Sequence, residues 1–243
     1  MLSEDLFERN IMIYVTSDLH GYPFEKFMEL LKTANFSDDD FCFILGDVID
    51  RGDDGIKYLE WLMVQPNVEL LLGNHEAMMM SNLFLFNEVT EEEIEKLDGE
   101  QMELLSNWIE NGGSPTLKAL TECKPELIED IIEYLKDIPV YDMVSVGGQD
   151  FFLSHSGLAN FEKGKSIEQY EIDDFIWNRP LITDVYFDDM ISVFGHTPTG
   201  LFGKEYSGKV LRTKNWIDVD TGVSSGYLPV LLRLDDLKEF YLN

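Results

Sequence analysis

The chain has 243 residues, and its 18 Lys+Arg against 47 Asp+Glu give a formal net charge of −29. A hydrophobic content of 44% is enough to build a core, which excludes a disordered chain despite the charge. The acidity argues against nucleic acid or an anionic membrane surface as the main partner, because both require basic patches.

The first part of the chain, up to Phe86, alternates short apolar runs with segments of helical spacing. This order predicts an α/β fold in which crossover helices join parallel strands. In such a sheet the functional loops follow the carboxyl ends of the strands. The predicted strands here are 11–15, 41–45 and 68–72, and the predicted helices are 23–34, 55–64 and 75–86.

Residues 88–138 are helical and acidic, and we interpret them as a helical insertion or cap over one edge of the sheet. Thr90 is placed to cap one helix, Ser114 to cap a second and Pro125 to begin a third. Strand patterns then return with no visible linker, so we predict a single domain over 1–243. The later predicted strands are 140–146, 150–154, 191–194, 209–212, 216–219 and 229–234.

The two cysteines, Cys42 and Cys123, do not suggest a disulfide framework. Cys42 lies in the apolar run 41–45, where a core thiol is expected. The chain shows no basic stretch followed by an apolar one near its start, and no apolar run long enough to span a bilayer. These features predict a cytoplasmic protein with no membrane partner.

Chemically reactive side chains follow each of the first three predicted strands. Asp18 and His20 follow the first, Asp47 the second and Asn74 the third. Because the carboxyl ends of neighbouring parallel strands meet at one edge, we expect these side chains to converge. Carboxylate, imidazole and amide groups are oxygen and nitrogen donors, so the pattern predicts a manganese, iron or zinc site without thiolate ligands.

All four histidines of the chain follow apolar runs. A single histidine in such a place is more often structural than a ligand. The joint occurrence of all four, together with the aspartates and the asparagine above, favours a metal centre. The four are His20, His75, His155 and His196.

Five short motifs carry these residues. They are Asp-x-His-Gly at 18–21, Gly-Asp-x-x-Asp-Arg-Gly at 46–52, Gly-Asn-His-Glu at 73–76, His-x-Gly-Leu at 155–158 and Gly-His-Thr at 195–197. Together they resemble the phosphoprotein phosphatase family of calcineurin-like metallophosphoesterases. Residues 108–113 and 220–222 are similar to the compact bacterial and phage branch, which includes serine/threonine phosphatases and symmetrical diadenosine tetraphosphatases.

The resemblance implies a four-layer α/β/β/α sandwich of two mixed sheets, with the site at strand ends between them. It also implies two divalent metal ions, manganese in the first place, with iron or zinc as alternatives. A carboxylate shared between two dications places negative charge where both need it. By position in the motifs, the implied ligands are Asp18 and His20 for the first metal, Asp47 for both, and Asn74, His155 and His196 for the second.

The motifs also imply catalytic roles for four further side chains. His75 would protonate the leaving alkoxide, and Asp50 would orient its ring. Arg51 would hold the phosphate oxygens, together with Arg179, whose segment Trp-Asn-Arg-Pro at 177–180 resembles the compact branch. The implied reaction is direct in-line attack by a metal-bridging hydroxide, with no phosphoenzyme.

We therefore predict a phosphoester hydrolase, and specifically a serine/threonine protein phosphatase acting on phosphorylated protein or small phosphoesters. The alternative is a symmetrical diadenosine tetraphosphatase or another nucleotide phosphohydrolase, because the motifs do not determine the leaving group. A non-catalytic phosphate-binding scaffold is disfavoured, since His75, Asp50 and Arg51 accompany all the ligands. The tyrosine-bearing loop of the eukaryotic enzymes is not recognisable, so no regulatory subunit is implied.

Overall fold

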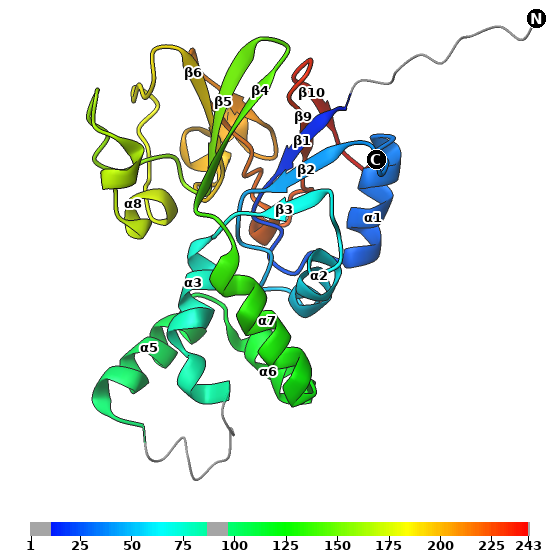
Figure 1. The fold of residues 1–243 in the computed structure, drawn as a ribbon, viewed down its shortest axis with the longest axis vertical. Helices are drawn as coiled ribbons and strands as arrows, with labels where there is room; N and C mark the ends of the chain where they lie inside the picture. Colours follow the sequence, from blue (N-terminus) through cyan, green and yellow to red (C-terminus); the bar gives the residue numbers. More distant parts are fainter. Residues whose placement is uncertain (1–10, 87–96, 243) are drawn as a thin grey trace, which may run out of the picture.

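The computed structural model describes residues 11–86 and 97–242; residues 1–10, 87–96 and 243 are not described. The predicted helix cap at Thr90 therefore lies outside the described residues. Two five-stranded mixed sheets form the body of the molecule (Figure 1). Among the described residues, no helix combines the length and the apolar character needed to cross a membrane.

The first sheet has the order β10-β9-β1-β2-β3. Its middle strands β1, β2 and β3 are parallel, and β9 lies antiparallel to both β1 and β10. The three predicted parallel strands are thus confirmed, while β10 has no counterpart among the predicted strands. The bounds are β1 Ile13–Thr16, β2 Phe41–Ile44, β3 Val68–Leu70, β9 Leu231–Arg233 and β10 Lys238–Phe240.

The second sheet has the order β4-β5-β6-β8-β7. Strands β5, β6 and β8 are parallel, and the edge strands β4 and β7 are antiparallel to their neighbours. Each of these strands falls within a residue or two of a predicted one. The bounds are β4 Tyr141–Val146, β5 Gln149–Ser154, β6 Met190–Phe194, β7 Leu211–Arg212 and β8 Trp216–Asp218.

Side chains alternate between the two faces of each strand, and this separates three layers of core. Val15 and Phe43 of the first sheet pack with Leu153 of the second in the layer between the sheets. Tyr14 points to the opposite face and packs with Phe27 of a covering helix. With helices outside both sheets, the predicted four-layer sandwich is confirmed.

The outer layers are formed by α1 (Phe24–Thr33) and α2 (Gly55–Leu62) on the first sheet and the short α8 (Ile172–Ile176) on the second (Figure 1). Cys42 is fully buried in the core on the helix side of the first sheet, so the predicted core thiol is confirmed, and both cysteines are free. Short 3₁₀ turns lie at Leu83–Phe86, Ile167–Gln169, Thr199–Leu201, Lys204–Tyr206 and Val223–Ser225.

A second group of helices lies below the sheets in Figure 1 and contains α3, α5, α6 and α7. The predicted helix 75–86 is shorter than expected, since α3 ends at Ser81. The prediction that Ser114 caps α6 is wrong by one residue, because Gly113 occupies the cap position. The bounds are α3 Asn74–Ser81, α5 Gly99–Glu110, α6 Ser114–Glu122 and α7 Pro125–Asp137, the last of which begins at the predicted proline.

Candidate metal centre

The predicted ligands meet in the loops that follow β1, β2, β3, β5 and β6. Backbone hydrogen bonds join the first two of these loops, from the Asp18 N–H to the Gly46 carbonyl and from the His20 N–H to the Asp47 carbonyl. The side chains are shielded from solvent, with exposed fractions between 0% and 7%. The six residues are Asp18, His20, Asp47, Asn74, His155 and His196.

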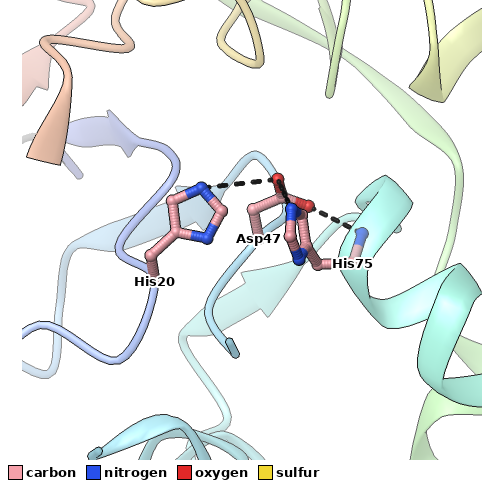
Figure 2. A group of neighbouring side chains, drawn as sticks. All are labelled: His20, Asp47 and His75. Atoms are coloured by element: carbon pink, nitrogen blue, oxygen red, sulfur yellow. Dashed lines mark hydrogen bonds and ion pairs between the residues drawn. The ribbon is translucent and has the colours of Figure 1, made fainter. Parts of the chain in front are cut away.

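Asp47 lies at the centre of this group, between histidines from different loops (Figure 2). Its Oδ2 is 3.7 Å from His20 Nε2 and 3.8 Å from His75 Nε2. Its Oδ1 is 3.5 Å from His155 Nε2. Because the two oxygens face two different sets of nitrogen atoms, Asp47 is placed to bridge two cations.

Two neighbouring sets of side chains have the spacing of metal ligands. One set comprises His20, Asp47 and His75, and the other comprises Asp47, His155 and His196. Asp18 adds to the first set, since its Oδ1 is 3.8 Å from His20 Nε2. The other oxygen of Asp18 accepts hydrogen bonds from the Ser17 hydroxyl and from the His196 N–H.

The chemistry of the donor atoms in the second set fits a cation. His155 donates from Nδ1 to the Leu45 carbonyl at 2.6 Å, which leaves Nε2 as an acceptor. That nitrogen is 2.9 Å from Asn74 Oδ1, which is also an acceptor, and 3.2 Å from His196 Nδ1. Acceptor atoms that converge without a proton between them are stabilised by a positive ion.

Charge states in the centre also suit metal binding. Burial is the main cause that lowers the pKa of His20 and of His155, and burial together with His155 lowers the pKa of His196 to about 2. The three imidazoles are therefore neutral near pH 7, and neutral imidazole is the form that binds metals. Burial, with Asp18 and Glu76 nearby, raises the pKa of Asp47 well above its usual range, so a bound cation would stabilise its ionised form.

His75 lies beside the six predicted ligands, between Asp50 and Arg51. Its Nδ1 is 2.6 Å from Asp50 Oδ2, and its Nε2 is 3.0 Å from a guanidinium nitrogen of Arg51. The other terminal nitrogen of Arg51 lies 2.8 Å from His20 Nε2. Arg51 is exposed, whereas both of its histidine partners are buried, so the guanidinium lies at the mouth of the site.

Arg179 approaches the same mouth from the loop after α8. Its Nη1 is 3.5 Å from the His196 carbonyl, and its side chain is exposed. The structure thus brings together all ten predicted site residues, although they come from loops up to 178 residues apart in the chain. Two exposed guanidinium groups therefore lie beside the buried cluster of candidate metal ligands.

Comparison with known proteins agrees with this geometry. The Calcineurin-like phosphoesterase family matches residues 11–224, which is most of the chain. The chain belongs to the calcineurin-like phosphoesterase family. It is a metallophosphoesterase, a hydrolase that acts on phosphoester bonds, and its motifs are consistent with the phosphoprotein phosphatase branch.

Two groups of relatives differ in how much of this phosphoesterase they match. Serine/threonine-protein phosphatase 2 of Salmonella typhimurium is 25% identical over 91% of this chain and 90% of its own length. A symmetrical bis(5'-nucleosyl)-tetraphosphatase of Buchnera aphidicola is 37% identical over 71 residues, which are 28% of this chain. This chain spans about a quarter (26%) of the length of that tetraphosphatase.

Solved structures show the same fold at low sequence identity. A protein provisionally named a diadenosine tetraphosphatase has a TM-score of 0.63 and 14% identity, over 97% of this phosphoesterase and 94% of that chain. A serine/threonine phosphatase from Saccharomyces cerevisiae has a TM-score of 0.53 and 14% identity, over 92% of this chain and 72% of its own.

Glu76 of this phosphoesterase, the last residue of the Gly-Asn-His-Glu motif, binds backbone N–H groups in two loops. Its carboxylate accepts the Gly73 N–H at the start of α3 at 3.1 Å. It also accepts the N–H groups of Asp47 at 2.8 Å and Val48 at 2.9 Å. Glu76 therefore joins the loop after β2 to the start of α3 and fixes the backbone of the central ligand.

The backbone of the site is unusual. Six of the nine described non-glycine residues with positive φ belong to the candidate site, with φ between 45° and 68°. This left-handed region costs roughly 1–2 kcal/mol for a residue that carries a Cβ. The six are Asp18, His20, Asp47, Asp50, Arg51 and His196.

Asp218 and Asp220 are buried acidic residues that the sequence analysis did not assign to the centre. Burial, Asp220 and Asp18 raise the pKa of Asp218, and its Oδ2 has no hydrogen-bond partner among the described residues. Burial and Asp18 likewise raise the pKa of Asp220. A buried acid of this kind binds its proton more tightly in the folded state, so it destabilises the fold as pH rises above the unfolded pKa of about 3.9.

We therefore expect Asp218→Asn to stabilise the metal-free protein at neutral pH, because Asn removes the charge and keeps an acceptor for the Asp220 N–H. The expected rise in Tm at pH 7 is roughly 2–4 °C, the shift that about 1 kcal/mol produces in a chain of this size. The gain should disappear near pH 4. Thermal unfolding from pH 4 to pH 8 measures it, with exposed Asp39→Asn as the control. A gain that is independent of pH would contradict the electrostatic cause.

Proposed function

We propose that this phosphoesterase removes phosphate from phosphoserine and phosphothreonine in proteins, using two divalent metal ions. The observation that carries the proposal is the likeness to serine/threonine-protein phosphatase 2 of Salmonella typhimurium, which extends over nine-tenths of both chains (91% and 90%). The match to the Buchnera tetraphosphatase covers 28% of this chain.

The donor set supports the assignment of the ligands. Asp18, His20 and Asp47 would hold one metal, and Asp47 with the three residues Asn74, His155 and His196 would hold the other. Nitrogen and oxygen donors without thiolate suit manganese, which we propose as the metal, with iron or zinc as alternatives. The bound metals would supply Lewis-acid stabilisation of phosphoryl charge and a water acidic enough to serve as the nucleophile near pH 7.

The chain's own side chains would perform the remaining steps. Arg51 and Arg179 lie exposed at the mouth, where their guanidinium groups bind phosphoryl oxygens and stabilise the charge of the transition state. His75 directs Nε2 toward the same mouth and donates a proton to the departing oxygen. Asp50 accepts the Nδ1–H at 2.6 Å, which orients the ring.

The buried pair of His75 and Asp50 can serve an ester substrate, but both residues belong to motifs that do not determine the leaving group. A serine or threonine alkoxide is a poor leaving group and needs a proton as the bond breaks, whereas a nucleotide phosphate leaves readily without one. A symmetrical diadenosine tetraphosphatase is the second candidate, supported by the 37% identity to the Buchnera enzyme. We also propose that the chain acts as one domain without a regulatory subunit, with α5 to α7 as an insertion beside Asp50 and Arg51.

A side-by-side assay tests the proposal. The purified protein, loaded with manganese, is given a phosphoserine peptide, diadenosine tetraphosphate and p-nitrophenyl phosphate, and kcat/KM is compared. We expect the peptide to exceed the dinucleotide by at least about tenfold, which corresponds to about 1.4 kcal/mol of transition-state binding. A tenfold preference for the dinucleotide would overturn the protein-phosphatase proposal and favour the second candidate.

A further inference from the structure

The end of helix α5 lies against the residues proposed to serve the leaving group. The indole Nε1–H of Trp108 donates to Asp50 Oδ2 at 2.8 Å, and both residues have an exposed fraction of 0%. The chain after α5 also contacts Arg51, since Gly112 accepts the Arg51 N–H and Asn111 accepts its Nε–H through the backbone carbonyl. These contacts join residues that are 58 to 61 positions apart in the sequence.

The indole and the imidazole bind the same carboxylate oxygen. Asp50 Oδ2 is 2.6 Å from His75 Nδ1 and 2.8 Å from Trp108 Nε1, while Oδ1 has no hydrogen-bond partner in the described part of the chain. The backbone N–H of Asp50 donates to the Thr116 hydroxyl at 2.9 Å. The carboxylate is therefore held through Oδ2 alone, and Thr116 holds the backbone of the same residue.

This arrangement leaves the orientation of Asp50 dependent on Trp108. A carboxylate held by a single imidazole donor can rotate about its terminal torsion, which is broad and roughly two-fold. A second donor from a rigid ring removes that freedom. Close packing against Gly113, where a Cβ would lie 2.6 Å from the indole nitrogen, holds the ring in place.

We propose that Trp108 is a positioning residue for the leaving-group step, acting through Asp50 on His75. This inference rests on the proposed role of His75 as the proton donor. No bond to the indole is made or broken: it holds the carboxylate, and the carboxylate holds the imidazole whose Nε2 faces the site. Outer-shell hydrogen bonds of this kind typically contribute about 10–100-fold.

Trp108→Phe tests the proposal, because it removes the N–H and keeps an aromatic ring. We expect kcat for a phosphoserine peptide to fall about 10–100-fold, while p-nitrophenyl phosphate, whose phenolate leaves readily, loses less than about threefold. Trp216→Phe is the matched control, since this buried indole donates to the Asp184 carbonyl at 3.0 Å and lies in a different core cluster from Trp108. Equal losses for both substrates in Trp108→Phe, or the same split in Trp216→Phe, would overturn the proposal.

A double-mutant cycle separates this inference from the proposed function. If Trp108 acts through Asp50, Trp108→Phe causes no further loss in an Asp50→Asn background, whereas losses that multiply would overturn the inference. His75→Asn measured in parallel identifies the other failure. If His75→Asn slows the peptide and p-nitrophenyl phosphate equally, the proposed role of His75 fails. If His75→Asn slows the peptide more than p-nitrophenyl phosphate and Trp108→Phe does not, only the positioning role of Trp108 fails.

A measurement on the unsubstituted protein tests the Trp108–Asp50 hydrogen bond even if Trp108→Phe does not fold. The chain has four tryptophans, so a spectrum with nitrogen-15 in the indoles contains four Nε1–H signals. We expect the Trp108 signal in metal-free protein to lie downfield, as a donor to a carboxylate, and to move upfield in Asp50→Asn. An unchanged signal would overturn the inference, whatever the substrate of the enzyme.

Discussion

Asp47→Asn is expected to abolish both turnover and metal loading. Asp47 is the residue whose two carboxylate oxygens face different histidines, at 3.7 Å and 3.5 Å, so the amide removes charge from both proposed metal positions. The metals contribute several kcal/mol to stabilisation of the transition state, and each 1.36 kcal/mol is a factor of ten in rate. We expect kcat/KM for p-nitrophenyl phosphate to fall by at least about 10³-fold, with little metal retained after gel filtration.

Asp53→Asn provides the control for this result, because Asp53 is an exposed carboxylate in the loop that follows β2. It should retain metal and activity within about twofold, as expected for a surface substitution. An Asp47→Asn protein that stays folded, keeps two metals per chain and loses less than tenfold activity would contradict the bridging role.

His75→Asn is expected to separate substrates by their leaving groups. General acid catalysis contributes about 10²–10⁴-fold, so a phosphoserine peptide should slow by this factor. A p-nitrophenolate needs little protonation, and its release should slow by no more than about tenfold. The metal content should not change, because the substitution leaves all six proposed ligands in place.

Metal content makes this experiment decisive, since His75 also lies within ligand spacing of His20 and Asp47. Loss of metal from His75→Asn would make His75 a ligand. Equal slowing of both substrates with the metals retained would remove it from the proton-donor role. Asp50→Asn should reproduce the leaving-group split in weaker form, because the imidazole remains but loses its carboxylate acceptor.

The parallel core of the fold could be predicted because its signals are local. The runs that form β1, β2 and β3 are apolar, short and each followed by a helical pattern. Strand β10 was missed because two of its three residues, Lys238 and Glu239, are charged, so it lacks the apolar run that marked the other strands. Helix α8 was missed because its five residues form little more than one turn, which is too short to show helical periodicity.

The candidate site could likewise be predicted only in part. The side chains that follow apolar strands could be named from the sequence, since the edge of a sheet brings them together. The contacts from Trp108 and Thr116 to Asp50 could not, because they depend on how the helical segment docks 58 and 66 residues away. The contact from Glu76 to the Asp47 N–H could not be predicted for a similar reason, since Asp47 lies 29 residues earlier, in another loop.

The left-handed backbone of the site has a consequence for protein engineering. Copying the side chains of Asp18, Asp47 and His196 onto the ends of ordinary strands in another scaffold would not reproduce the centre, because their φ angles of 52°, 58° and 68° aim them differently. A transplant would have to carry whole loops, with the Glu76 anchor that holds one of them. Libraries that seek thermal stability by inserting residues suited to right-handed backbone should leave the six site residues with positive φ unchanged. These are Asp18, His20, Asp47, Asp50, Arg51 and His196.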